Sequence, residues 1–411
     1  MPASPPVRIL FVSHNGGMAG AQQTLLTLLE GMDRKIFEPH LAVPYQGELA
    51  ERVARLGIPV YVTQLQHWVP CVAGLSHQNR LRHLAKMLRH IHWRVHAITA
   101  LIKRHRIDVV YTNTVTCIEG AVAARITQQP HIWHIHEPIG GNSELLPLLP
   151  VWLYTKIIRL LSKRVVFPSR ALARDYPALR GKAAIVPNGL SLPPLIERDA
   201  ARQEVGATLG LDPLYQRVAV VGAIQPRKDH ATFLKAAKRI LARKEKVDFL
   251  IVGSGSDFYT RELSERVKAM GLADRVTITG RWPLPIHTMM AAIDVLVISS
   301  EQESFGLTAI ESLALETPVV PTLCGGPAEI IEPGVTGVLV NIKDDAAMAD
   351  AILSLLDDPV RAQKFGAEGR RRVGARYTQA HYVGGIQTAL LEVCGSQPGI
   401  ESVEVADKAS S

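Results

Sequence analysis

Residues 299–331 read SSEQESFGLTAIESLALETPVVPTLCGGPAEII. A short turn after Ser300 leads into an apolar helical stretch that starts near Phe305, and a second apolar run, PVVPT, ends at a pair of glycines. A helix between two buried strands is the repeating unit of a parallel sheet, because parallel strands need a crossover connection. The segment therefore predicts a doubly wound α/β domain, whose ligands bind at the carboxyl edge of the sheet.

The same alternation of strands and helices extends in both directions along the chain. RILFVS, PHLAVP and VYVTQL are separated by helical stretches, and the pattern restarts with RVAVVGA, VDFLIVG and VTITG. Between the two series, IVPNGLSLPPLIERD has the turn residues and Pro-Pro pair of a linker. We predict an N-terminal half over residues 1–190, a C-terminal half over 191–375, a helix over 376–394 that returns to the N-terminal half, and a flexible tail over 395–411.

Composition is that of a packed intracellular protein. Apolar residues make up 47% of the 411 residues and charged residues 20%, which argues against disorder over most of the length. The four cysteines are scattered, with no C-x-x-C pair, so neither a disulfide framework nor a zinc site is indicated. The first residues lack the features of a secretion signal, and no apolar run reaches the roughly 18 residues of a membrane span. A cytoplasmic protein is expected.

A net charge of +8 favours anionic partners. Phosphates, anionic lipid surfaces and nucleic acid all satisfy that description. Nucleic acid is the least favoured of the three, because little aromatic interleaving accompanies the basic residues.

Motifs in the C-terminal half resemble glycosyltransferase family 4. Glu303, Phe305, Gly306 and Glu311 form the pattern E-x-F-G-x-x-x-x-E before an apolar helix. VGAIQPRK, LIVGSGS and TGRW precede it in the order found in that family. The resemblance implies a retaining, two-domain glycosyltransferase of the GT-B fold, with two Rossmann-like domains facing each other across a cleft and a nucleotide-sugar donor held by the C-terminal half.

The resemblance assigns a role to each matching position. It implies that Glu303 contacts the hydroxyls of the donor sugar and that Glu311 contacts the ribose, as suits carboxylates that accept two hydrogen bonds. On its own, the pair would be better explained by a capping carboxylate and a solvated helix face; the ordered motifs around it reverse that preference. The donor-binding candidates are Gly20, Gly222, Gly253, Gly255, Arg281, Phe305, Gly306, Leu307, Glu311, Gly325 and Gly326. As alternatives, Gly253 and Gly255 merely end a strand, and Gly325 and Gly326 form a flexible turn.

Lys228 is expected to offset charge on the leaving diphosphate. The family usually has Gly-Arg where this chain has Gly222 and Ala223. We therefore expect Arg227, whose guanidinium can bind two phosphate oxygens, to replace the missing cation. No Asp-x-Asp occurs, so we expect neither a metal nor another cofactor.

The N-terminal half, which the resemblance implies is the acceptor-binding domain, offers a glycine-rich turn and a histidine. SHNGGMAGAQQ resembles the family's G-G-A-E-R loop, with Gly20 in a glycine position and Gln22 in place of the glutamate. HIWHIHEP places His134 and His136 on one face of a strand. We expect His136 to bind the transferred sugar or orient the acceptor; a buried core histidine is the alternative. A zinc site is less favoured, because the spacing suggests no third ligand.

Residues 80–106 form a basic stretch with apolar residues at helical spacing. Arg82, Lys86, Arg89 and Arg94 are expected either to face solvent or to dock the protein on anionic lipid. The predicted partners are thus a UDP- or GDP-sugar donor, a glycan, lipid-linked or small-molecule acceptor, and an anionic membrane surface. The competing hypotheses are a nucleotide-sugar epimerase and a non-catalytic protein that binds sugar nucleotides or glycans.

Overall fold

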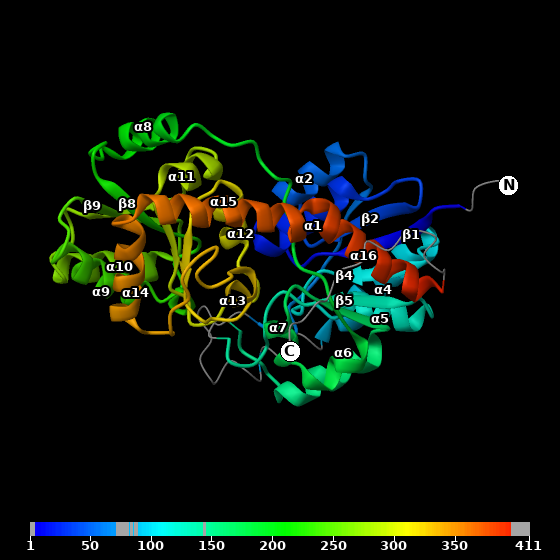
Figure 1. Ribbon diagram of the computed structural model, residues 1–411. Helices are drawn as coiled ribbons and strands as arrows, with labels where there is room; N and C mark the ends of the chain where they lie inside the picture. The colour runs from blue at the N-terminus through cyan, green and yellow to red at the C-terminus, as the bar shows by residue number, and fades with distance from the viewer. Residues whose placement is uncertain (1–4, 71–81, 83–84, 86–88, 143–144, 396–411) are drawn as a thin grey trace.

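The computed structural model describes residues 5–70, 82, 85, 89–142 and 145–395. They form two α/β halves that lie side by side, each built on a parallel sheet (Figure 1). Apart from Gly395, the tail expected to be flexible lies outside the described residues.

The N-terminal half contains a seven-stranded sheet with the order β3-β2-β1-β4-β5-β6-β7. Its strands are β1 (Val7–Val12), β2 (Phe37–Val43), β3 (Val60–Val62), β4 (Val109–Thr112), β5 (His131–His134), β6 (Arg164–Phe167) and β7 (Ala183–Ile185). Its helices are α1 (Gly20–Gly31), α2 (Glu48–Arg55), α4 (Ile91–Arg104), α5 (Glu119–Ile126), α6 (Val151–Leu161), α7 (Arg170–Arg174) and the 3-10 helix η1 (Pro177–Lys182).

The C-terminal half contains a five-stranded sheet with the order β10-β9-β8-β11-β12. Its strands are β8 (Gln216–Val221), β9 (Val247–Val252), β10 (Val276–Gly280), β11 (Val295–Ile298) and β12 (Val319–Pro321). Its helices are α8 (Arg198–Leu209), the 3-10 helix η2 (Pro226–Lys228), α9 (His230–Leu241), α10 (Asp257–Ala269), α11 (Ile286–Ala292), α12 (Leu307–Ala314), α13 (Gly326–Ile330), α14 (Asp345–Leu356) and α15 (Pro359–Arg376).

The central strands are buried along most of their length. Every residue of β9 and β11 is buried, as is the second part of β1. Helices that cover a parallel sheet leave little of its strands in water, so these strands read as continuous apolar runs. The predicted pair of doubly wound halves is confirmed.

Each sheet reverses its strand order once. The reversal lies between β1 and β4 in the first sheet and between β8 and β11 in the second. Loops that follow the two central strands of a doubly wound sheet diverge to opposite sides and leave a crevice at their carboxyl ends. The two crevices are therefore the expected binding sites.

The last helix, α16 (Gln379–Cys394), packs against α1 in the N-terminal half, although it follows the final helix of the C-terminal half (Figure 1). Tyr382 is buried in the same apolar cluster as Leu25 of α1, and the Gln379 side chain donates a hydrogen bond to the Thr27 carbonyl at 2.8 Å. The chain between β7 and α8, where the linker was placed, has no regular secondary structure beyond an isolated bridge at Leu190. The division into domains at residue 190 stays a prediction.

Two further contacts join the halves beside α7. The Ser169 hydroxyl donates to the Ser304 carbonyl at 2.6 Å. The Glu329 carboxylate accepts the backbone N–H groups of Arg170 and Ala171, which have no acceptor within their own helix because they lie in its first turn. The E-x-F-G turn is thereby tied to the N-terminal half.

One expectation about the basic stretch is wrong. Arg94 is only 4% exposed, and its guanidinium forms an ion pair with the fully buried Glu119 at 2.7 Å. It therefore cannot dock on lipid. Arg82 and Arg89 are exposed, whereas Lys86 lies outside the described residues. Among the residues that the structure describes, no helix combines the length and apolarity needed to cross a bilayer.

We expect Gly366→Ala to destabilise the protein, because an added Cβ would overlap the Glu316 carbonyl oxygen where α15 packs against the end of α12. Overpacking of this kind costs about 1–3 kcal/mol. Gly384 is the matched control, since it is also helical but has nothing within 4 Å of an added Cβ. Gly384→Ala should stabilise by up to about 1 kcal/mol through helix propensity. Urea unfolding measures both; equal effects of the two changes would contradict the packing described for α15.

Candidate active site

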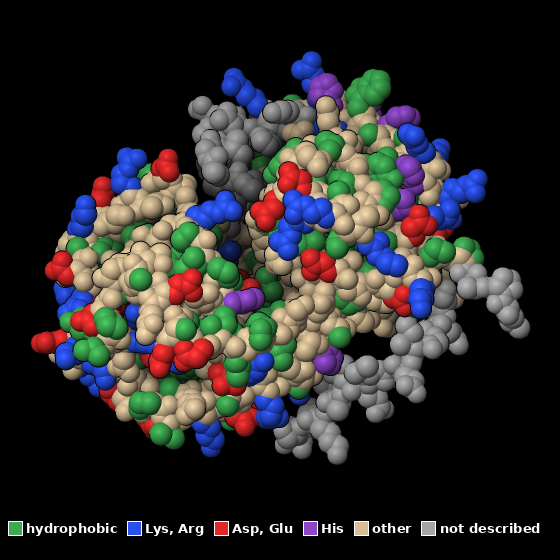
Figure 2. All heavy atoms as spheres, turned by 90° about the horizontal axis from the view of Figure 1, so that it is seen from above, with side chains coloured by type: hydrophobic (Ala, Val, Ile, Leu, Met, Phe, Trp, Pro, Cys, Tyr) green, Lys and Arg blue, Asp and Glu red, His purple; other side chains and the backbone are tan. Residues whose placement is uncertain are grey.

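A cavity of about 500 Å³ lies between the two halves. Its walls are the chain segments that follow β1, β4, β5, β6 and β7 on one side and the loops that follow β8 and β11 on the other, so both strand-order reversals open into it. The space-filling view shows a deep hollow between the halves, with lysine and arginine side chains at its rim (Figure 2). Ten of the sequence-predicted residues line this cavity: Gly20, His136, Gly222, Arg227, Lys228, Glu303, Phe305, Gly306, Leu307 and Glu311.

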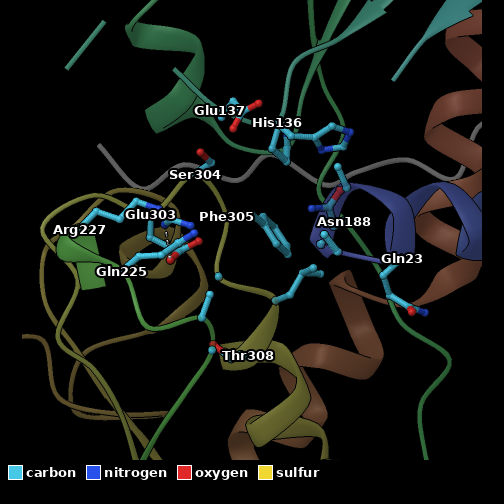
Figure 3. A pocket seen from close by; sticks show the side chains of 18 of the residues that line it. Gln23, His136, Glu137, Asn188, Gln225, Arg227, Glu303, Ser304, Phe305 and Thr308 are labelled. Carbon is cyan, nitrogen blue, oxygen red and sulfur yellow. Dashed lines mark hydrogen bonds and ion pairs between the residues drawn. The ribbon is translucent and has the colours of Figure 1, made fainter. Parts of the chain in front are cut away.

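Three charged side chains meet on the C-terminal wall. The Glu303 carboxylate binds the Lys228 ammonium in a close ion pair and lies 3.3 Å from Nη1 of Arg227 (Figure 3). Burial opposes ionisation of Glu303, but the charges of Lys228 and Arg227 outweigh it and lower the pKa of the carboxyl group. Two cationic side chains thus surround the Glu303 carboxylate at the cavity wall.

Backbone hydrogen bonds hold this cluster in place. The Arg227 carbonyl accepts the N–H of Glu301 at 2.8 Å, and the Lys228 carbonyl accepts the Ser299 hydroxyl at 2.7 Å. The loops after β8 and β11 are therefore fixed to each other. This explains how Arg227 and Lys228, which are adjacent in sequence, both reach Glu303.

The Gly325–Gly326 loop supports Glu303 from behind. Gly326 N–H donates to the Glu303 carbonyl at 2.8 Å, and Glu303 N–H donates to the Cys324 carbonyl at 2.7 Å. Gly325 has φ +113°, and an added Cβ there would lie 2.7 Å from the Glu303 carbonyl oxygen. Only glycine permits this approach. Neither glycine lines the cavity, so the loop positions the motif, and direct contact with the donor stays a prediction.

The first turn of α12 forms the floor between the two walls. Its N-cap is Gly306, and Gly306, Leu307 and Thr308 line the cavity. Such a helix end carries partial positive charge that favours phosphate. Glu311 lies one turn further along, where burial raises the pKa of its carboxyl group to about 7. No described residue donates a hydrogen bond to the Glu311 carboxylate.

On the N-terminal wall, His136 lies beside Glu137, which also lines the cavity (Figure 3). Nε2 of His136 lies 2.9 Å from Oδ1 of Asn113, whose amide group donates to the Ala21 carbonyl at 2.9 Å. A carbonyl only accepts, so the amide must present its NH₂ group to Ala21 and its oxygen to His136. Nε2 of His136 therefore carries the proton, and Nδ1 remains an acceptor. Burial, followed by the nearby His14, lowers the pKa of His136 to about 3, which keeps the ring neutral.

The remaining predicted residues lie outside the cavity lining. Gly253 and Gly255 pack against the backbone of residues 222–224, where an added Cβ would overlap carbonyl oxygens. Arg281 is exposed beyond the end of β10. The donor contacts assigned to these residues stay predictions, although the structure gives the two glycines a packing reason.

Several residues that line or support the cavity were not predicted from the sequence. Figure 3 labels Gln23, Asn188, Gln225 and Thr308 among the side chains around the cavity, and Asn113 lies behind His136. Asn113 directly follows β4. Its position at the end of a strand next to the sheet reversal could have identified it as a candidate site residue from the sequence. His134 is fully buried, with Nδ1 2.8 Å from the Tyr111 hydroxyl. Within the described part of the chain, no cluster of three or more His, Cys, Asp or Glu side chains has the arrangement of a metal site.

Comparisons with known proteins agree with this geometry. The family model described as Glycosyltransferase Family 4 matches residues 18–192, and the one described as Glycosyl transferases group 1 matches residues 205–372. D-inositol 3-phosphate glycosyltransferase of Segniliparus rotundus is 36% identical over 209 residues, which is 49% of this chain and 45% of that protein. Alpha-maltose-1-phosphate synthase of Mycobacterium tuberculosis is 26% identical over 308 residues, 66% of this chain and 76% of that protein.

The chain spans about half the length of the inositol phosphate glycosyltransferases that it matches. Among solved structures, Anabaena HepE in complex with UDP and glucose superposes with a TM-score of 0.76 at 20% identity, covering 93% of this chain and 99% of that one. Sucrose-phosphate synthase from Thermosynechococcus elongatus gives a TM-score of 0.70 at 20% identity, with 95% and 100% covered. The fold is therefore GT-B, and the chain, which carries a Glycosyltransferase Family 4 domain followed by a Glycosyl transferases group 1 domain, belongs to the glycosyltransferases that these two models describe.

Proposed function

We propose that this protein is a retaining, metal-independent glycosyltransferase that moves a sugar from a UDP- or GDP-sugar to a glycan, lipid-linked or small-molecule acceptor. The observation that carries the proposal is the cluster of Lys228, Arg227 and Glu303 beside the first turn of α12. It supplies cations for a diphosphate and a carboxylate for sugar hydroxyls within one cavity.

Charge development defines the role of each group. As the bond between the sugar and the diphosphate breaks, negative charge grows on the leaving phosphate, where Lys228, Arg227 and the α12 N-terminus would stabilise it. Glu303, once Lys228 binds phosphate, is free to accept sugar hydroxyls. The acceptor hydroxyl then attacks the anomeric carbon from the side that the diphosphate leaves, and its proton passes to a departing phosphate oxygen.

His136 is suited to orient the transferred sugar through a hydrogen bond rather than to act as a general base. Its neutral ring offers Nδ1 as an acceptor for a sugar hydroxyl, while Nε2–H is held by Asn113. A ring with a pKa near 3 is a weak base, so hydrogen bonding is the role that fits.

The relatives support a nucleotide-sugar donor. HepE was crystallised with UDP and with UDP-glucose. A thermal-shift panel of UDP- and GDP-sugars tests the donor, because a ligand that binds the native state raises the melting temperature. If no nucleotide sugar changes the melting temperature, the proposal is wrong. Epimerised free donor would favour the epimerase, and binding without donor hydrolysis would favour a non-catalytic protein.

Lys228→Ala and Arg227→Ala should each lower turnover strongly, by roughly 100-fold or more, because each removes a cation from the developing phosphate charge. Nucleoside diphosphate release from the best donor measures the effect. Lys235→Ala is the matched control, since this lysine is exposed on α9 and lines no part of the cavity. Full activity in Arg227→Ala would remove Arg227 from the mechanism and leave Lys228 acting alone.

Donor binding should release protons near neutral pH. Burial holds the pKa of Glu311 near 7, and ribose hydroxyls that donate to its carboxylate would favour the charged form and lower that pKa. Affinity for a nucleotide sugar should therefore rise as pH increases through 7 and then level off. Calorimetry in buffers of different ionisation enthalpy measures the released protons. In Glu311→Gln the release should vanish and the affinity should fall; unchanged release would exclude Glu311 from the ribose site.

We infer that the protein makes peripheral contact with an anionic membrane on its inner, cytoplasmic face. Fewer cationic residues can take part in this contact than the sequence suggested. Arg82 and Arg89 remain exposed, and Trp93, 63% exposed, follows them at the start of α4. An exposed tryptophan next to cations suits the polar headgroup region.

Vesicles of phosphatidylglycerol should sediment the protein, neutral phosphatidylcholine vesicles should not, and binding should weaken as salt rises. Arg82→Glu combined with Arg89→Glu should abolish the binding, whereas Lys235→Glu in the other half should not. Binding that ignores salt, or that survives the double substitution, would reject this surface.

A further inference from the structure

The short helix α7 lies where the two halves meet and packs against α13 of the C-terminal half (Figure 1). Ser169 directly precedes this helix and Tyr176 follows it, so the two residues lie at opposite ends of one short segment. Both side chains are buried, with 2% and 1% of their surfaces exposed. Neither residue lines the active-site cavity, yet each forms a hydrogen bond to the backbone of a residue that does.

Ser169 contacts the C-terminal wall of the cavity. Its hydroxyl donates to the carbonyl of Ser304, which directly follows Glu303 in the E-x-F-G turn. The same hydroxyl accepts the N–H of Leu172 at 3.1 Å, which fixes its direction. The Glu329 carboxylate accepts the next two N–H groups of the chain. The turn that carries Glu303 is therefore held against the start of α7.

Tyr176 contacts the N-terminal wall of the cavity. Its hydroxyl donates to the Glu137 carbonyl and accepts the N–H of Ile139, both at 3.0 Å. Its ring belongs to the same apolar cluster as Ile135 and Ile139, which lie on either side of the segment that contains His136. This segment is therefore fixed both by apolar packing and through its backbone.

The segment from Ser169 to Tyr176 thus joins two parts of the site that face each other. Figure 3 shows His136 and Glu137 on one side of the cavity and Glu303 on the other. We propose that Ser169 and Tyr176 are positioning residues, which through α7 set the separation between Glu303 and His136.

This inference rests on the proposed glycosyl transfer, in which Glu303 and His136 bind hydroxyls of the same donor sugar. The two side chains come from different halves, so a shift of one half against the other would change their separation. A misplacement of about 1 Å can lower a rate about 100-fold. One segment in contact with both walls opposes such a shift.

Loss of this positioning should lower turnover without weakening donor binding. The groups proposed to bind the diphosphate, Lys228, Arg227 and the first turn of α12, all belong to the C-terminal half. Tyr176→Phe removes the hydroxyl and keeps the ring, and Ser169→Ala removes the contact to the E-x-F-G turn. Each change should lower kcat about tenfold or more and leave donor KM within about threefold.

Tyr154→Phe is the matched control for Tyr176→Phe. Tyr154 is equally buried, and its hydroxyl also donates to a backbone carbonyl and accepts backbone N–H groups, but none of these partners lines the cavity. Asp358→Ala is the control for Ser169→Ala, because Asp358 caps α15 as Ser169 caps α7. Both controls should keep the kcat of the wild-type protein.

Double-mutant cycles separate positioning from general destabilisation. If Tyr176 acts through His136, Tyr176→Phe should cause no further loss of turnover in a His136→Ala background. Ser169→Ala should likewise cause no further loss in a Glu303→Gln background. Additive losses in both cycles would overturn the proposal, as would wild-type kcat in both single variants or an equal loss in Tyr154→Phe.

Failure of the transferase itself gives a different result. If the wild-type protein turns over no nucleotide sugar, the proposed function is wrong, and amide hydrogen exchange then decides the role of α7. Ser169→Ala should speed exchange in residues 135–139, and Tyr176→Phe should speed exchange in residues 301–306, each on the opposite wall, whereas Tyr154→Phe should change neither. Faster exchange only on the wall that each residue contacts directly would show that α7 does not link the walls and would overturn the inference.

Discussion

A buried carboxylate must be compensated, and at Glu303 that requirement shapes the whole C-terminal wall. An isolated charge would be costly to bury, whereas a charge that receives ion pairs and hydrogen bonds can remain ionised. Lys228 and Arg227 provide that compensation from a loop 75 residues away in sequence. The loops after β8 and β11, which diverge from the reversal of the sheet, are thereby drawn together around the mouth of one cavity.

Two cationic side chains contact one carboxylate on this wall, beside the first turn of α12. On the opposite wall, Asn113 fixes the neutral form of His136, and burial keeps His14 neutral too. The Glu137 side chain also lines that wall. The cationic side chains of the cavity thus lie where a diphosphate would bind, while the opposite wall presents imidazoles and a carboxylate.

Sequence patterns predict the parts of this arrangement that repeat or that lie close together in the chain. Apolar runs of strand length, separated by helical stretches, were sufficient for the two doubly wound halves, because the strands of a covered parallel sheet are buried on both faces. The Glu303 turn could also be recognised from the sequence, because its carboxylate, its glycine and the helix that follows are close together in the chain. Arg227 was found because it adjoins Lys228, although its contact with Glu303 required the folded loops.

Partners far apart in sequence could not be predicted in this way. Helical spacing identified the basic stretch around Arg94 but gives no information about Glu119, a buried residue 25 positions later. Arg94 was therefore predicted to be a surface charge, whereas it forms a buried ion pair. Asn113 belongs to no motif and acquires its place only when Ala21 and His136 converge on it.

These two pairings hold the N-terminal half together next to the candidate active site. Arg94 and Glu119 join α4 to α5, and Asn113 joins the end of β4 to the start of α1 beside the cavity. Glu119 would be an uncompensated buried charge without Arg94, and it also accepts the N–H of Gln66, so the pair fixes the loop that follows β3. The two carboxylates are thus compensated in different places: Glu303 by Lys228 and Arg227 at the cavity wall, and Glu119 by Arg94 in the interior of the N-terminal half.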